Sequence, residues 1–408
     1  MFRHRLALAA ALVCSAIACD DTDDTPMDAA PIIIVDAEMD AAPPLDAESA
    51  ADAAPLDAMP PAEDAAVDAA PPCGIACATL AWADGPPRPR VSDHHTTFIA
   101  RGDDETALFV AGGIASDAQG GISDMTPLIH RAVIGADGSL GEWHEAKYPL
   151  PFPLAFHGQA QIDNTIWLAA GVSVDRQGPF GSRAVVAITV APDARLDRVE
   201  RCDDLPAPAV HPTLVPLDGR LYLIGGTTNA PIDQVLVGEL GDDPCDITWS
   251  AGPSLPATRS HHAAGVYDGR IYVLGGFSVG QAPDPRIWRS VHDDTGALTG
   301  WEEVGAVDPA PWTSSALVID DTLWLFGGGE GQGFQATFVN TVRRATFAED
   351  GTVGPFSPVD AALPIARSHV HQTPLFDGRV YSVGGRVFDD AGAIESTDRV
   401  FIGTLTVP

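Results

Sequence analysis

Short apolar runs that end in two glycines recur along the chain at a nearly constant interval. They occupy residues 108–113, 221–226, 271–276, 323–328 and 380–385, and a degenerate copy ending in Ala-Gly occupies residues 166–171. The last glycines of the six runs are 58, 55, 50, 52 and 57 residues apart. An apolar run of this length is typical of a buried strand, and a regular period of this size indicates a repeat architecture.

The sequence around each run predicts three further strands. Asp-Gly pairs at 218–219, 268–269 and 377–378 precede three of the runs, and this pair favours a two-residue hairpin because it tolerates positive φ. A third strand follows each run, as at residues 234–240, and a fourth strand begins near an aromatic residue. These aromatic residues are Trp143, Trp249, Trp301 and Phe356. Four short strands per period predict an all-β fold in which each repeat is one propeller blade.

The repeat resembles the kelch family, whose blades carry a Gly-Gly doublet that closes the second strand and a Trp in the fourth. The resemblance covers residues 79–405, and it implies a six-bladed β-propeller of four-stranded antiparallel blades. Blade two departs from the pattern, because Ala170 replaces a glycine and Val199 replaces the aromatic residue. We therefore expect blade two to be the most irregular.

The two ends of the repeat region complement each other. The sixth repeat stops after its third strand at residues 399–405, and the chain ends at Pro408. Residues 82–86, Trp-Ala-Asp-Gly-Pro, are similar to residues 249–253, Trp-Ser-Ala-Gly-Pro, which belong to a fourth strand. The N-terminal strand is therefore predicted to complete the last blade and close the ring, which removes the open sheet edges.

The first 19 residues predict export. Arg3 and Arg5 precede a short apolar run at residues 6–13, which is typical of a secretory signal and too short for a membrane span. The run leads to Ala-Ile-Ala-Cys at residues 16–19. This ending resembles the bacterial lipoprotein cleavage box, in which the cysteine becomes lipidated, so Cys19 is the predicted anchor of a protein that faces the periplasm or the cell surface. An ordinary cleaved signal is the alternative.

Residues 20–72 differ in composition from the rest of the chain. They consist mainly of Ala, Asp and Pro and contain fifteen acidic residues without a Lys or Arg, so they are predicted to form a disordered tether before a domain at residues 73–408. The whole chain carries a net charge of −33. Without the fifteen acidic tether residues and the two signal arginines the domain still carries −20. A polyanion repels phosphate backbones, so nucleic acid is not a predicted partner, and membrane contact is expected through the lipid anchor only.

Four cysteines belong to the predicted domain, namely Cys73, Cys77, Cys202 and Cys245. An even number in an exported chain indicates disulfides, and four cysteines allow three pairings. Sequence proximity favours Cys73 with Cys77. A metal site at these two cysteines is the alternative, but it lacks a neighbouring pair of ligands.

Histidines concentrate where each blade begins. Counting back thirteen residues from the first glycine position of each doublet, or seventeen in the first repeat, whose hairpin is four residues longer, gives one position per blade. The residues at this position are His95, His157, Pro212, His262, Ser314 and His371. One residue earlier stand His94, Phe156, His211, His261, Thr313 and Val370, and His369 lies two residues before His371. Seven of the twelve histidines fall at these twelve positions, so chance placement explains them poorly.

Three interpretations of these histidines remain open. They can be structural groups inherited with the repeat, ligands of a transition metal, or part of a cationic site for a carboxylated sugar or an acidic peptide. The kelch resemblance implies that the blade starts open on one mouth of the channel, where Arg90, Arg259 and Arg367 would join the histidines, with Ser260 and Ser368 nearby. The predicted ligand-binding candidates are these three arginines with His94, His95, His157, His211, His261, His262, His369 and His371. No resident metal or cofactor is predicted.

The predicted function is that of a binding module, in which a cell-envelope lipoprotein presents the propeller mouth to a protein or carbohydrate. The alternative is a carbohydrate-active enzyme resembling N-acetylneuraminate mutarotase, which acts with arginine and a carboxylate; Glu330 and the arginines at the blade starts are its candidates. A galactose-oxidase-like copper enzyme is disfavoured, because none of the five tyrosines stands at a blade start. A scaffold that holds another envelope protein is a third hypothesis.

Overall fold

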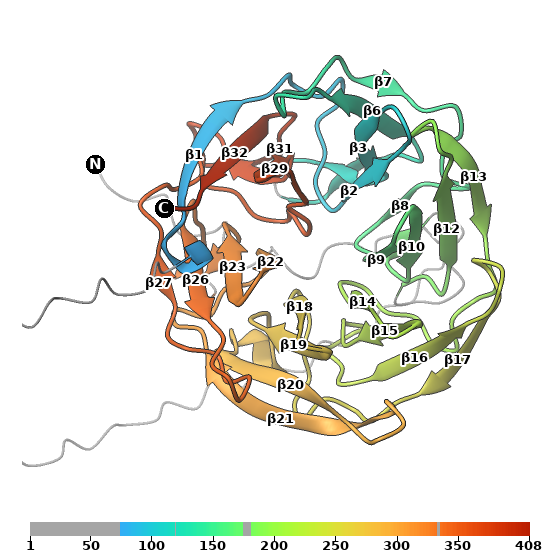
Figure 1. Cartoon of the computed structure of the whole chain (residues 1–408), viewed down its shortest axis with the longest axis vertical. Helices are drawn as coiled ribbons and strands as arrows, with labels where there is room; N and C mark the ends of the chain where they lie inside the picture. The colour runs from blue at the N-terminus through green and yellow to red at the C-terminus, as the bar shows by residue number, and fades with distance from the viewer. Residues whose placement is uncertain (1–73, 119, 174–180, 333–334) are drawn as a thin grey trace, which may run out of the picture. The chain divides into compact units, whose positions relative to one another are not determined.

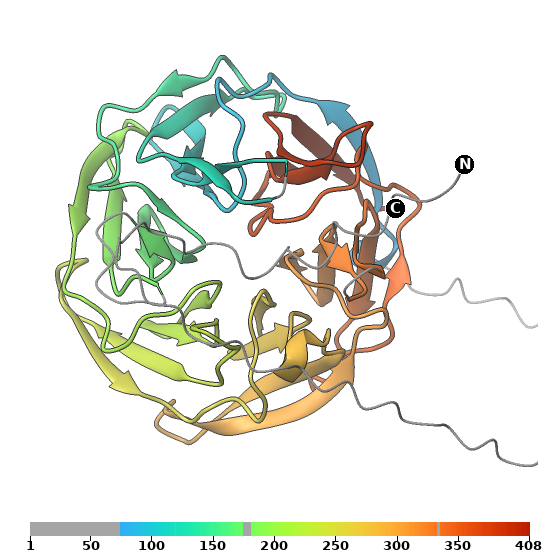
Figure 2. The same cartoon turned by 180° about the vertical axis from the view of Figure 1, so that it is seen from behind.

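Six four-stranded antiparallel sheets surround a common axis in the computed structural model, which describes residues 74–118, 120–173, 181–332 and 335–408. Figures 1 and 2 show this ring of blades from opposite sides. Within each blade the first strand lies nearest the axis and the fourth lies outermost (Figure 1). The all-β architecture and the six blades predicted from the repeat are confirmed.

The strands of each blade follow one another along the chain, with one exception in blade 6. Blade 1 is β2 (Thr96–Arg101), β3 (Thr106–Ala111), β6 (Ile129–Ile134) and β7 (His144–Glu145). Blade 2 is β9 (Gly158–Ile162), β10 (Thr165–Ala169), β12 (Val185–Val190) and β13 (Leu196–Arg201). Blade 3 is β14 (Thr213–Leu217), β15 (Arg220–Ile224), β16 (Val235–Leu240) and β17 (Ile247–Ala251).

The second half of the ring has the same plan. Blade 4 is β18 (Ala263–Tyr267), β19 (Arg270–Leu274), β20 (Arg286–His292) and β21 (Leu298–Ala306). Blade 5 is β22 (Ser315–Ile319), β23 (Thr322–Phe326), β26 (Val342–Thr346) and β27 (Ser357–Pro358). Blade 6 is β28 (Leu375–Phe376), β29 (Arg379–Val383), β32 (Val400–Thr406) and, from the other end of the domain, β1 (Thr79–Asp84).

The ring closes through β1, as the sequence predicts. β1 pairs antiparallel with β32 over six residue pairs, from Thr79 with Thr406 to Asp84 with Phe401. In Figure 1 the blue strand β1 lies beside the red strand β32. β1 thereby covers the edge of β32 and gives blade 6 the same four strands as the other blades.

The two faces of the ring differ in the length of their connections. On one face, called the turn face here, the first and second strands of five blades are joined by two-residue turns, as at Asp268–Gly269. On the other face, called the loop face, the connections from second to third strand are long and form further two-stranded hairpins. These pair β4 (Ile114–Ser116) with β5 (Ile122–Met125), β24 (Gly329–Glu330) with β25 (Thr337–Phe338), and β30 (Arg386–Phe388) with β31 (Ile394–Ser396).

Three smaller elements complete the fold. β8 (Leu154–Ala155) pairs with β11 (Val172–Ser173), and short 3-10 helices form at Gly74–Cys77 (η1) and Val279–Gln281 (η2). The chain enters the domain on the turn face, because Leu405, the partner of Leu80, donates its N–H to the carbonyl of Gly378 in a two-residue turn. Among the described residues no helix combines the length and apolarity that crossing a membrane requires.

The core consists of apolar layers between neighbouring blades. Side chains alternate in direction along a strand, so Phe109 of β3 packs toward blade 2, whereas Leu108 and Val110 pack toward blade 6. The outer tryptophans join the same layers. Trp82, Trp143 and Trp301 each donate the indole N–H to a carbonyl of the preceding blade, at Ala361, Pro86 and Pro253.

The glycine doublets fasten each blade to the start of the next one. In blade 3 the N–H of Gly226 donates to the carbonyl oxygen of Arg259 at 2.8 Å. Gly225 has φ of +59°, and a Cβ there would lie 2.3 Å from the same oxygen. No side chain fits so close to a carbonyl, and this explains why apolar runs end in glycine at a fixed interval.

Blade 2 is not the most irregular blade, contrary to the expectation from its sequence. Its four strands have five or six residues each, whereas the inner strand of blade 6 has only two, Leu375 and Phe376. Ala170, which replaces a doublet glycine, keeps the left-handed conformation at φ of +65°. The surrounding hydrogen bonds therefore impose the backbone shape even on a residue that disfavours it.

A disulfide joins blades 2 and 3. It links Cys202, which follows β13, to Cys245, which lies between β16 and β17. Cys77 is also disulfide-bonded, and Cys73, the partner favoured by proximity, lies outside the described residues. Cys19, the predicted signal and the predicted tether also lie outside them.

Candidate functional site

Six residues, one from the start of each blade, form a ring around the axis. Each has a positive φ between 50° and 60°. Five of the six steps around the ring carry a backbone N–H···O=C bond to the preceding blade, with lengths from 2.8 to 3.4 Å. We call this set the axial ring: His94, Phe156, His211, His261, Thr313 and His369. A left-handed conformation costs a non-glycine residue about 1–2 kcal/mol, so the ring bonds hold a strained backbone in place.

The ring corrects the sequence alignment of blade 6. His369 occupies the ring position at which the count from the doublet places Val370. The reason is one additional residue: Gly384 follows His369 by fifteen residues, whereas Gly275 follows His261 by fourteen. His371 consequently lies two residues beyond the ring, not one.

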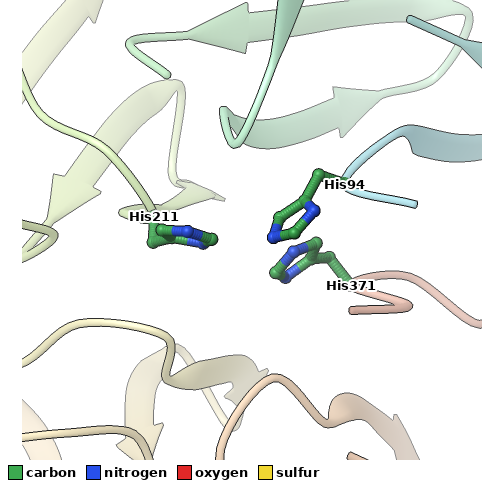
Figure 3. Close-up of side chains that lie close together, drawn as sticks. All are labelled: His94, His211 and His371. Carbon is green, nitrogen blue, oxygen red and sulfur yellow. The ribbon is translucent and has the colours of Figure 1, made fainter. Parts of the chain in front are cut away.

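Five histidines gather at the axis. Figure 3 shows His94, His211 and His371 pointing toward one another from three different blades. One ring nitrogen of each lies within 4.8 Å of one nitrogen of each of the other two. His261 stacks on His211 with the ring centroids 3.6 Å apart, and the centroid of His369 lies 4.2 Å from that of His94.

The three central histidines have buried ring nitrogens that make no hydrogen bond. These are Nε2 of His94, Nδ1 of His211 and Nε2 of His371, judged against all described residues. A buried polar atom without a partner costs about 1–3 kcal/mol. Other buried nitrogens also lack a partner, but His94, His211 and His371 are distinguished by lying together, which makes the axis a candidate ligand site.

Burial keeps these imidazoles neutral. It lowers the pKa of His94 and His211 well below the ordinary value of 6.5, and Arg386 lowers the pKa of His94 further. Burial also lowers the pKa of His371, to about 4. Neutral imidazole is the form of histidine that offers a nitrogen lone pair to a ligand.

The histidines one step beyond the ring are structural. Nε2 of His95 donates to the carbonyl of Val383 at 3.1 Å, and Nδ1 accepts from the hydroxyl of Ser92 at 3.0 Å. His262 bonds through Nε2 to the hydroxyl of Thr213 at 2.8 Å. His157 is also buried, and Nδ1 of His157 and Nδ1 of His262 make no hydrogen bond to the described residues. The interpretation of inherited structural histidines fits His95 best, because both of its ring nitrogens are bonded.

The arginines at the blade starts do not line a ligand site. Arg259 is fully buried, donates to the carbonyl of Gly275 at 2.8 Å and pairs with Asp284 at 3.0 Å. Arg367 is also buried and donates to the carbonyl of Gly384 at 2.7 Å. The expectation that these two face a ligand is wrong, because their guanidinium groups are used inside their own blades.

The other charged candidates also have partners. Arg90 is partly exposed and forms an ion pair with Asp124. Glu330 lies 3.3 Å from Arg343, and burial raises its pKa. Neither residue belongs to the axial cluster.

Sequence reasoning missed the carboxylate beside the cluster. Asp93 is fully buried and its Oδ1 accepts a hydrogen bond from Nδ1 of His94. The hydroxyls of Ser116 and Ser396 donate to its Oδ2, and Arg386 forms an ion pair with it at 3.2 Å. The signal was present in the sequence: Asp93 is the one acidic residue immediately before an axial-ring position.

The buried structural histidines predict acid sensitivity. Burial lowers the pKa of His157 to about 3 and that of His262 well below 6.5. Below pH 6.5 these histidines bind protons in the unfolded chain but not in the folded chain. Their contribution to the free energy of unfolding is therefore complete above pH 6.5 and is lost as the pH falls toward 3. From pH 7.5 to 5.5 we expect each of these residues to lower the free energy of unfolding by about 1.4 kcal/mol.

Urea denaturation at pH 7.5, 6.5 and 5.5 measures this loss. The variant His157→Gln should lose part of the pH slope, since its side chain does not titrate. An equal slope in the variant and the natural protein would contradict the assignment, whatever the absolute stability of the variant.

Comparisons with known proteins agree with this architecture. Residues 258–289, which include His261, β18 and β19, match the Kelch motif. No curated protein matches the chain. The solved structure of YjhT is similar to this chain, with a TM-score of 0.56 and 13% sequence identity, and the match covers 79% of this chain and 99% of that one. At this identity the likeness shows the fold alone. The domain is a six-bladed β-propeller that contains a Kelch motif at residues 258–289.

Proposed function

We propose that this protein is an exported, membrane-tethered binding module whose ligand is held at the axis of the propeller. The observation that carries the proposal is the axial cluster, in which His94, His211 and His371 present buried nitrogens without partners. A merely structural histidine can have both ring nitrogens hydrogen-bonded, as His95 does. The cluster therefore has the chemistry of an incomplete binding site.

The loop face supports the same proposal. Its connections form the hairpins β4–β5, β24–β25 and β30–β31, whereas on the turn face the first and second strands of five blades are joined by two-residue turns. Long ordered loops on one side of a rigid scaffold are where binding residues usually lie. The chain enters the domain on the turn face, and the proposed binding side is the opposite, loop face.

Export and anchoring rest on the sequence. The basic start, the short apolar run and Cys19 favour a lipoprotein, and the acidic segment at residues 20–72 favours a flexible tether. The enzyme alternative is less well supported, because Arg259 and Arg367 are buried within their blades and Glu330 pairs with Arg343. The proposed partner is a protein, a carbohydrate or a smaller ligand carried at the axis.

A melting-temperature panel with the full chain in detergent tests the proposal. The probes are N-acetylneuraminate, a neutral oligosaccharide, a poly-glutamate peptide and the chlorides of divalent transition metals. A probe at 100 times its Kd stabilises the folded state by about 2.7 kcal/mol, and we expect at least one probe class to raise the melting temperature by several degrees.

The matched pair of variants locates the effect. His371→Ala removes an axial imidazole outside the strained ring, and His144→Ala removes an exposed histidine of β7. The shift should disappear in the first variant and persist in the second. If no probe shifts the natural protein, or if the shift survives His371→Ala, the axis is not the binding site.

A further inference from the structure

We infer that the axial cluster is a transition-metal site in which His94, His211 and His371 are the ligands. This inference rests on the proposed function, because it names the ligand class that the axis holds. The three residues come from blades 1, 3 and 6, and one nitrogen of each lies within 4.8 Å of the others (Figure 3). No single blade contains the site, so the closed ring assembles it.

The hydrogen bond between His94 and Asp93 indicates that the axial ligand is a cation and not an anion. A carboxylate accepts hydrogen bonds, so Nδ1 of His94 carries the proton that this bond requires. In the neutral ring Nε2 then has a lone pair and no hydrogen. Nε2 is buried and has no partner among the described residues. A lone pair directed into the cluster repels an anion and binds a metal cation.

Asp93 also orients His94, as a carboxylate beside a metal-binding histidine does. Histidine ligands usually donate their other ring N–H to a carboxylate, which fixes the tautomer and the ring orientation. Asp93 is itself held by the hydroxyls of Ser116 and Ser396 and by Arg386. Asp93 is therefore a positioning residue for His94.

The ligand set restricts the metal. Three neutral imidazoles suit Zn²⁺, Cu²⁺, Ni²⁺ or Fe²⁺ and do not suit Ca²⁺ or Mg²⁺, which prefer oxygen ligands. Tetrahedral Zn²⁺ with Zn–N bonds of about 2.0–2.1 Å places its ligand nitrogens about 3.3 Å apart. The present limit of 4.8 Å means that metal binding draws the imidazoles together by side-chain rotation. Three protein ligands leave a coordination position for water or for an anionic group of a larger ligand.

A second cluster on the outer surface is not an equivalent site. Glu200, Asp243 and Cys245 also lie close together. However, Cys245 is bonded to Cys202, and Asp243 already pairs with Arg198 at 3.1 Å. This group lacks a free thiolate, so it provides a useful control and no competing proposal.

Metal stoichiometry tests the inference directly. The full chain in detergent is stripped with a chelator, dialysed and titrated with ZnCl2 and with CuCl2, and bound metal is measured by mass spectrometry after gel filtration. We expect one equivalent of metal per chain. His371→Ala and the double variant His94→Asn/His211→Asn should each bind less than about 0.2 equivalents, and Asn is chosen because it tolerates the left-handed backbone of the ring.

The controls separate ligand loss from unfolding. His144→Ala and Asp243→Asn should keep one equivalent, and circular dichroism of each metal-free variant reports whether the propeller is folded. Asp93→Asn should retain one equivalent at saturating metal while its affinity for Zn²⁺ falls 10- to 100-fold. A residue with only a structural role would change the melting temperature without this selective change in affinity.

The outcomes distinguish the two proposals. If the natural protein binds no metal, or if His371→Ala keeps its full equivalent, the metal site is wrong. If metal fails while a sugar or peptide still shifts the melting temperature in a His371-dependent way, the binding module survives with another ligand. If metal and all other probes fail, both proposals fall.

Discussion

Removal of residues 73–85 is expected to destabilise the propeller by about 5 kcal/mol or more and to make it aggregate. The truncation deletes β1, so β32 becomes an exposed edge strand without its six cross-strand pairs. It also removes Ile75, Ala78 and Leu80 from the core between blades 5 and 6, together with the half-buried Trp82. Burial of each large apolar side chain contributes about 1.5–3 kcal/mol, and urea denaturation with light scattering measures the combined loss.

A circular permutant tests whether the instability of the truncated chain comes from the absence of β1, because it restores this strand at the other end of the chain. Residues 73–85 are placed after Pro408 through a short Gly/Ser loop, which suits the geometry because Thr79 lies opposite Thr406 in the antiparallel pair. The permutant should recover most of the stability and solubility of the natural protein. If the truncated chain melts at the same temperature as the full chain, or if the permutant is no better than the truncation, strand closure is not what stabilises blade 6.

Replacement of Cys202 and Cys245 by serine is expected to lower the free energy of unfolding by about 4 kcal/mol. The disulfide closes a loop with a sequence separation of 43 residues, and constraint of the unfolded chain by a loop of this length accounts for about that amount. The folded state should change little. Trp167 still donates to the carbonyl of Pro244 at 2.7 Å, and Arg198 still pairs with Asp243 at 3.1 Å, so blades 2 and 3 stay joined.

The serine double variant is preferable to a reducing agent, because a thiol would also reduce the disulfide of Cys77. The urea midpoint of the variant should fall, while metal stoichiometry at the axis stays the same. An unchanged midpoint would show that the disulfide is neutral for stability. A lost metal equivalent would show that the disulfide also shapes the folded ring.

The six-bladed fold could be predicted from the sequence because the same residues are needed at equivalent positions of each blade. The glycine doublets are periodic because a side chain at Gly225 would collide with the carbonyl of Arg259 in the next blade. The missing fourth strand of repeat six and the surplus strand around Trp82 identify the closure. Blade 2 could not be judged in the same way, because the tertiary hydrogen bonds hold Ala170 in the glycine conformation.

The candidate site is only partly readable from the sequence, because it depends on register and on contacts between distant blades. The histidines at the blade starts are visible as a group, but whether one faces the axis or packs between blades changes within a single residue, as His94 and His95 show. One additional residue in blade 6 moves His371 away from its expected position. The partners of Asp93 lie up to 303 residues away along the chain, at Ser396, and no local pattern reveals them.

The arginines illustrate the opposite error, in which a repeated polar residue is structural. Arg259 and Arg367 occur at equivalent places before the ring, and a positive charge there suggests an anion site. In the folded domain each guanidinium bonds to the first doublet glycine of its own blade, at Gly275 and Gly384. Repetition at equivalent positions therefore does not separate a requirement of the blade from a candidate site, because the buried arginines and the axial-ring histidines are both repeated.

The place at which the chain enters the domain has a mechanical consequence. β1 starts at Thr79 on the turn face and runs toward the loop face alongside β32. Under the proposed function, a force that pulls the N-terminal end of β1 away from the loop face acts along β1 and not across it. Its six residue pairs with β32 are then loaded in shear and share the force at the same time. A strand attached from the opposite direction would peel away one pair after another under a much smaller force.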